Sequence, residues 1–233
     1  MSIRTGRVSC ENNRRRSAFT IIELLVVTAM IGVLVTMIVP ALNVARESSR
    51  KAACQSNLRQ FGLGLAVYAE NHQGFFCSGA FDWRRDGAVT EIGWVADLVN
   101  QGIPVGKMLC PSNSAMVSET FNDLLAESAK VEICVDRLGS PPNTLPDGTE
   151  QVNPCRQIIS SSLEPGSDTR RVLVQEQILH KFYNTNYTAS WLLVRSRPLL
   201  SSSGNVISRK PQCSNSLLSR TATAGPLNQA VLD

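Results

Sequence analysis

Residues 19–42 read FTIIELLVVTAMIGVLVTMIVPAL, and this stretch decides the fold. From Leu24 to Leu42 the chain runs for 19 positions without a charged residue. As an α-helix this run would be about 28 Å long, close to the roughly 30 Å hydrocarbon core of a bilayer. Arginines concentrate on its N-terminal side, and basic residues mark the cytoplasmic side of a membrane helix. The run therefore predicts a single transmembrane helix whose N-terminal side is cytoplasmic.

The bulk composition indicates a folded domain on an anchor rather than a polytopic membrane protein. The chain has 233 residues, 43% of them hydrophobic, and a mean hydropathy of -0.03. Its net charge is +4, and residues 1–18 account for all of it with five arginines against Glu11. A nucleic-acid-binding protein would carry its basic surface on the folded part. We therefore expect no nucleic-acid partner.

Glu23 is a carboxylate at the start of the apolar run. A carboxylate costs about 2.5–3.5 kcal/mol at mid-bilayer and less near the edge, so it needs either a partner or a place among the headgroups. On its own, Glu23 is compatible with either interpretation. Its context favours a functional role.

Residues 14–25, Arg-Arg-Arg-Ser-Ala-Phe-Thr-Ile-Ile-Glu-Leu-Leu, resemble the prepilin signature of type IV pilins and type II secretion pseudopilins. The resemblance implies that prepilin peptidase cuts between Ala18 and Phe19 and methylates the new amine of Phe19. Glu23 then becomes the fifth mature residue, with a role in assembly, and Pro40 the twenty-second, where many pilins have a helix-kinking proline. Alanine at position 18 departs from the usual glycine, and this puts the efficiency of cleavage in doubt.

The resemblance is strong over residues 14–71. The Cys54-x-Ser-Asn-Leu-Arg-Gln continuation and a later Cys110-Pro-Ser look like the pilin-like families of planctomycete-type bacteria. It implies an inner-membrane, single-pass subunit with a periplasmic head. The implied partners are the lipid bilayer, other pilin-like subunits, prepilin peptidase and an inner-membrane assembly platform. The resemblance also implies that the chain is a non-enzymatic polymer subunit with no cofactor.

Electrostatics agrees with this role. The amine of Phe19 would be a cation, with a reference pKa of about 7.7–8.0, and methylation keeps its charge. In a filament, Glu23 of one subunit can meet the Phe19 amine of a neighbour, and mispairing is expensive in an apolar medium. The pair would then set the register between subunits. Thr28, Gly32, Thr36 and Pro40 share one helix face and either permit close helix packing or are ordinary scatter.

After Pro40 the chain stays helical but becomes amphipathic. An apolar stripe follows helical steps: Cys54, Leu58, Phe61, Leu65 and Tyr68. We expect one helix from about Thr20 to about Glu70 and an α+β, pilin-like fold, in which this helix packs on a small antiparallel sheet. The domains are a basic leader (1–18), the transmembrane half (19–42), the amphipathic half (43–71) and a periplasmic head (72–233).

Within the head, residues 93–99 and 119–125 predict short helices and the proline-rich residues 139–154 a loop. Residues 171–179 and 187–194 alternate and are rich in β-branched and aromatic residues, so they predict an antiparallel strand pair. The last residues, 225–233, look like a helix start cut short, and we expect an incomplete head.

Removing residues 1–18 leaves six of the seven cysteines. They either form disulfides, in an exported domain, or are buried thiols; the set is Cys54, Cys77, Cys110, Cys134, Cys155 and Cys213. No catalytic motif occurs. The two histidines are expected to be exposed, and arginines inside the acidic cluster of Asp82, Asp86 and Glu91 oppose a metal ion. The alternative function is a periplasmic binding or enzymatic domain on an uncleaved membrane anchor.

Overall fold

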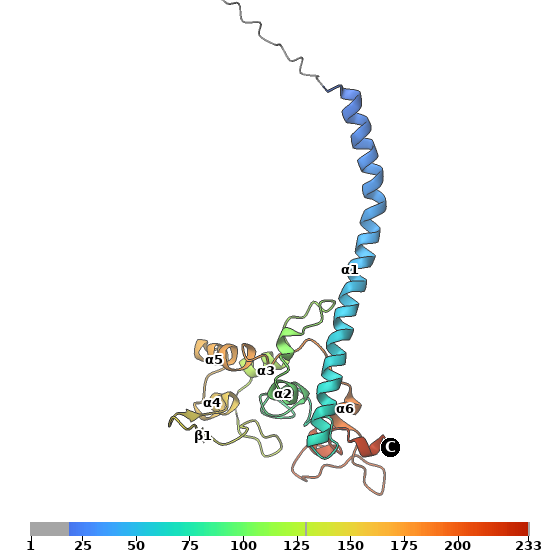
Figure 1. Cartoon of the computed structure of the whole chain (residues 1–233). Helices are drawn as coiled ribbons and strands as arrows, with labels where there is room; N and C mark the ends of the chain where they lie inside the picture. The colour runs from blue at the N-terminus through green and yellow to red at the C-terminus, as the bar shows by residue number, and fades with distance from the viewer. Residues whose placement is uncertain (1–18, 129, 233) are drawn as a thin grey trace, which may run out of the picture. The chain divides into compact units, whose positions relative to one another are not determined.

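The computed structural model describes residues 19–128 and 130–232 (Figure 1). The basic leader, and Ala18 on the N-terminal side of the expected cleavage, lie outside the described residues. The chain divides into two compact units, with the boundary between Ser48 and Ser49.

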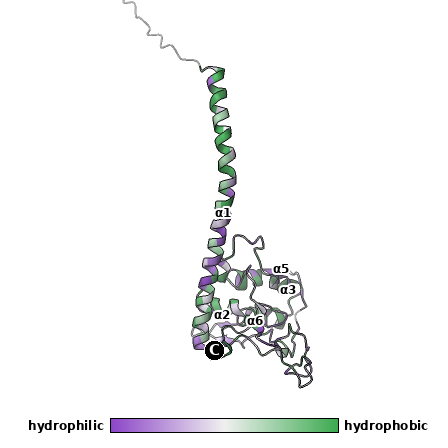
Figure 2. Ribbon diagram, turned by 90° about the vertical axis from the view of Figure 1, so that its right-hand side faces the viewer, coloured by the Kyte–Doolittle hydropathy of each residue, from purple (hydrophilic) through white to green (hydrophobic). Residues whose placement is uncertain are grey.

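Helix α1, Ile21–Asn71, is continuous over 51 residues and runs through Pro40. Its hydropathy changes along its length, from an almost wholly apolar N-terminal part to a mixed C-terminal part (Figure 2). It ends where predicted: the amide of Gly74 bonds the carbonyl of Ala69 at 2.9 Å, and Gly74 adopts a positive φ of 82°. A glycine in this conformation just after a helix satisfies its last carbonyls.

The second unit is built from short elements joined by long irregular segments. The two helices predicted near 93–99 and 119–125 are present as α2 and α3. The helical elements of this unit after α1 are α2 (Trp94–Asn100), η1 (Val105–Lys107), α3 (Thr120–Ala126), α4 (Pro154–Ser160), α5 (Asp168–Val174) with a π-helical turn (Gln175–Leu179), α6 (Trp191–Arg195), η3 (Arg220–Ala222) and η4 (Gln229–Val231).

The fold is α+β, as predicted, and its sheet is small. Strands β1 (Asn143–Thr144) and β2 (Glu150–Gln151) pair antiparallel, with Asn143 opposite Gln151, inside the segment predicted as a loop. Both strands are solvent-exposed. The part of α1 in the second unit therefore has other packing partners, which include Trp94 of α2 and Tyr187, both against Phe61.

The strand prediction for 171–179 and 187–194 is wrong, because the first segment is helical and the second consists of an irregular stretch followed by the start of α6 at Trp191. In the first, Val174 and Ile178 are buried together with Arg170 just before the segment, and their spacing of four places them on one helix face. Ser167 caps α5 by accepting a hydrogen bond from the Arg170 amide, and Ser190 caps α6 through the Leu193 amide. Capping and helical burial here prevail over the β-propensity of the branched side chains.

The face of α1 that packs in the second unit differs in part from the predicted stripe. Phe61, Gly64, Leu65 and Ala69 are buried, whereas Leu58 is 52% exposed. Asn57 takes its place, because its amide donates to the carbonyl of Met108 at 2.9 Å and to the hydroxyl of Tyr187 at 3.1 Å. A polar residue on this face is tolerated since its donors are satisfied.

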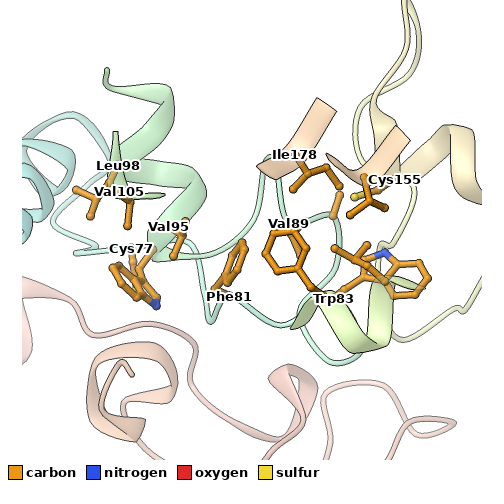
Figure 3. Packing of buried hydrophobic residues seen from close by; sticks show 14 of the residues in the cluster. Cys77, Phe81, Trp83, Val89, Val95, Leu98, Val105, Cys155 and Ile178 are labelled. Carbon is orange, nitrogen blue, oxygen red and sulfur yellow. The ribbon is translucent and has the colours of Figure 1, made fainter. Parts of the chain in front are cut away.

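The hydrophobic core lies among α2, α4, α5 and the segment that follows α1, around the fully buried Trp83 (Figure 3). Four of the six cysteines form the disulfides Cys54–Cys110 and Cys134–Cys213. The other two, Cys77 and Cys155, are free thiols buried in the core. Of the two alternatives that the sequence left open, disulfides hold for four of the cysteines and buried thiols for Cys77 and Cys155, which pack as small apolar side chains.

Candidate assembly segment

The first turn of α1 is closed by a reciprocal cap between Thr20 and Glu23. The Glu23 carboxylate accepts hydrogen bonds through Oε2 from the Thr20 amide at 2.9 Å and from its hydroxyl at 2.8 Å. In return, the Glu23 amide donates to Thr20 Oγ1 at 3.3 Å. This is a capping box: each of the two backbone amides lacks a partner within the helix and donates instead to the side chain of the other residue. Glu23 thus has a local role that is independent of any other subunit.

The cap uses one carboxylate oxygen of Glu23. Among residues 19–128 and 130–232, no donor bonds Oε1 and no cation lies within ion-pair distance of it. The described chain therefore gives Glu23 a cap but no cationic partner. Phe19, four residues earlier, is 82% exposed and directly precedes the cap.

The helix satisfies its own polar groups along the apolar run. The hydroxyl of Thr28 donates to the carbonyl of Leu25 at 3.0 Å, and that of Thr36 to Val33 at 2.7 Å. A hydroxyl bonded within its own helix does not need water, which suits a hydrocarbon environment. By length and composition α1 can cross a membrane.

The apolar side chains of this segment cover no core. From Phe19 to Leu42 every described residue is exposed, and a Cβ placed on Gly32 would meet no atom within 4 Å. A contiguous apolar surface of this kind marks a site for lipid or for another protein.

The acidic cluster predicted in the second unit is not a single site. Asp86 forms a buried bidentate ion pair with Arg195. Asp82 pairs with Arg85 at 2.9 Å, and Glu91 accepts from the amide of Ser140 at 2.7 Å. Within the part of the chain that the structure describes, no group of three or more His, Cys, Asp or Glu side chains is arranged to hold a metal ion.

Both histidines are exposed, as predicted. His72 lies on the ring of Tyr68 with a centroid distance of 3.7 Å, and its Nδ1 lies 2.8 Å from the carbonyl of Tyr68. His180 lies 3.2 Å from Glu176, one turn earlier. Within residues 19–128 and 130–232, neither histidine is hydrogen-bonded to a Ser or Cys side chain.

A disulfide and the side chain of Asn57 join α1 to the segment around Cys110. Cys54 on α1 bonds Cys110, 56 positions later. Asn186 holds the same segment, because its side chain accepts from the Cys110 amide at 2.8 Å and donates to the Cys110 carbonyl at 3.0 Å. The C-terminal part of α1 is therefore fixed to the rest of the second unit covalently as well as by packing.

Sequence reasoning missed two residues of these arrangements. Thr20 could have been found, since a Thr followed three positions later by Glu before an apolar run is the signature of a capping box. Arg195 had no such signal, because its partner Asp86 is 109 positions away.

Two family models match the chain. Residues 13–39 match the prokaryotic N-terminal methylation motif, and residues 43–123 match a protein of unknown function (DUF1559). No curated protein matches the chain, and no solved structure matches it. The first match covers Ala18, Phe19, Glu23 and the apolar run as far as Val39, and both matches agree with the resemblance in the sequence.

Proposed function

We propose, from the place of this chain in the type IV pilin-like family, that it is a pseudopilin subunit that polymerises through its first helix. Prepilin peptidase would cut between Ala18 and Phe19 and methylate the new amine. The mature subunit would serve a type II secretion or type IV pilus system. Proteins of this family are generally structural, and we propose no catalytic activity for this chain.

One observation carries the proposal: the Glu23 carboxylate, at the head of an exposed apolar helix, has no cationic partner among the residues that the structure describes. Leaving that charge unpaired in lipid is costly. Cleavage before Phe19 would create a cation four residues away, at the exposed end of the same segment. A neighbouring subunit could then bring its amine to Glu23 Oε1 while Oε2 keeps the cap with Thr20.

The proposed topology follows from the same segment. The basic leader would remain in the cytoplasm, α1 would cross the inner membrane once, and the second unit would face the periplasm, where disulfides form and persist. The two disulfides of that unit agree with an oxidising compartment. The assembly platform and other pilin-like subunits would be the partners at the inner membrane.

The N-terminal mass of the protein from its native membrane tests processing. We expect a chain that begins at N-methylated Phe19. A chain that keeps Met1, or that starts near Leu42, would refute the pilin role and favour a domain on an uncleaved anchor or a secreted one.

A pair of variants separates the charge of Glu23 from its capping role. Glu23→Gln keeps the cap, because a glutamine at this position also completes a capping box. It removes the charge, so we expect normal cleavage but loss of the chain from cross-linked polymers. Thr20→Ala removes the cap and keeps the charge, so we expect polymers to remain. Normal incorporation of Glu23→Gln would show that charge pairing at Glu23 does not direct assembly.

A further inference from the structure

A cleft of about 470 Å³ opens in the second unit beside the C-terminal end of α1. We call it the arginine cleft and define it by Tyr68, His72, Phe75, Arg209, Arg220 and Pro226, which are among its lining residues. The assembly segment at residues 19–42 contributes no residue to it. Its volume is in the range of small-molecule sites.

Backbone hydrogen bonds bring the walls of the cleft together from distant parts of the chain. The Phe76 amide donates to the Leu227 carbonyl at 3.0 Å, and the Gln229 amide to the Gly74 carbonyl at 2.8 Å. Phe75 and Asn228 form an antiparallel bridge. The chain that follows α1 is therefore joined to residues 227–229, which places Pro226 opposite the end of the helix.

The two arginines lie on adjacent segments. The Arg209 amide donates to the carbonyl of Thr221 at 2.8 Å, directly after Arg220. The Arg209 guanidinium donates through Nη2 to the Ala224 carbonyl at 2.8 Å, which holds it in place and leaves other N–H groups available. The Arg220 side chain has no hydrogen bond or ion pair with any residue that the structure describes.

Carboxylates do not offset this charge at the surface of the cleft. No Asp or Glu is among the described residues that line it. Asp97 lies behind the lining residue Ser78 and is only 4% exposed. It accepts the Ser78 amide at 2.7 Å and the Ser78 hydroxyl at 2.8 Å, so its oxygens are already used.

A negative charge alone would not make a ligand fit this cleft, because much of the cleft's lining is apolar and flat. The rings of Tyr68 and His72 stack with an interplanar angle of 3°. Phe75 is 37% exposed, and Pro226 adds an apolar ring. Such surfaces pack against planar or aliphatic groups rather than against a fully hydrated ion.

We propose that the arginine cleft binds a small organic oxyanion, in which a carboxylate or phosphate is attached to an aromatic or aliphatic group. Arginine presents a planar fork of donors that matches both anions and can bind them with two parallel hydrogen bonds. The guanidinium groups of Arg209 and Arg220 would hold the anion, and the Tyr68, Phe75 and Pro226 side would hold the apolar group. This ligand site is additional to the proposed role in polymerisation.

The test uses the full chain in nanodiscs of zwitterionic phospholipid and ¹⁹F NMR of three probes. These are 3-(4-fluorophenyl)propionate, 4-fluorophenyl phosphate and the neutral 3-(4-fluorophenyl)propanamide. We expect saturable binding of one or both anions and at least about tenfold weaker binding of the amide, as the loss of charged hydrogen bonds implies. The two anionic probes distinguish a carboxylate ligand from a phosphate ligand.

Arg220→Gln is the informative variant, because its side chain holds no described part of the fold in place. We expect it to weaken anion binding about tenfold or more and the double variant Arg209→Gln/Arg220→Gln to abolish it. Arg171→Gln, an exposed arginine on α5, is the matched control and should bind as the parent does. Binding of neither anion, equal binding of the amide, or unchanged binding by Arg220→Gln with native disulfides would overturn the proposal.

Discussion

Gly64 and Gly62 lie two positions apart on α1, and the structure predicts that an alanine is less stable at Gly64 than at Gly62. A Cβ on Gly64 would lie 2.4 Å from Cδ1 of Ile103 and 2.5 Å from Cδ2 of Leu98. A Cβ on Gly62 would meet no atom within 4 Å. Gly64 is therefore the position where α1 and α2 make their close approach.

The two variants share one energy term, so their difference isolates packing. Glycine to alanine inside a helix gains up to about 1 kcal/mol from helix propensity at either position. At Gly64 the new methyl must displace both Leu98, which is fully buried, and Ile103, which is partly exposed. Forcing an extra methyl group into a packed core costs about 1–3 kcal/mol. We therefore expect Gly64→Ala to be about 1–3 kcal/mol less stable than Gly62→Ala.

Urea unfolding of the full chain in mild detergent, followed by tryptophan fluorescence, measures this difference. All three tryptophans, Trp83, Trp94 and Trp191, lie in the second unit, so the signal reports that unit and not the apolar helix. The parent should lie between the two variants or close to Gly64→Ala. Equal midpoints for the two variants would refute the close approach of α1 to α2.

Three further predictions concern buried groups of the second unit. Burial raises the pKa of Cys77 and of Cys155 to about 12, so both thiols should resist iodoacetamide in the folded chain and react after unfolding without reductant. Mass spectrometry measures the label, and rapid labelling of the native chain would contradict the burial of these thiols. Burial also raises the pKa of Asp97, so the stability that this group contributes is full below its pKa in the unfolded chain and falls as the pH rises through its pKa in the folded chain. As the pH is raised from 3 to 7, Asp97→Asn should therefore become more stable relative to the parent in urea titrations. A difference in stability that stays constant with pH would exclude this titration. Arg195→Met should lower the free energy of unfolding by about 3–5 kcal/mol, because it leaves Asp86 buried without its partner. Adding Asp86→Asn to this variant should recover part of the lost stability in the same urea assay. Additive effects of the two substitutions would show that the residues are not coupled.

Local patterns predicted the elements that depend on neighbouring residues. The length and end of α1 follow from hydropathy, helical spacing and Gly74, all of which lie close together in the sequence. The same reasoning failed at residues 171–179. Their branched side chains favour strands, but the burial of Val174 and Ile178 on one helix face and the cap at Ser167 decided for a helix.

The cysteines show a second limit of prediction from the sequence. Their number allowed disulfides, but spacing does not choose between Cys54–Cys110 and the other pairings, and it does not mark Cys77 and Cys155 as core residues. Pairing depends on which loops approach one another, and those loops contain little regular structure. The same holds for the arginine cleft, whose walls come from the end of α1, from the residues that follow it and from residues 209–226.

The sequence by itself determined the apolar helix, its single carboxylate at Glu23 and the signature around Ala18 and Phe19, because each is a property of consecutive residues. Only the tertiary structure decided what α1 packs against, which cysteines pair and how Asp86 meets Arg195 across 109 positions. The physical reason is that contacts between distant residues depend on the path of irregular segments, which no local periodicity records.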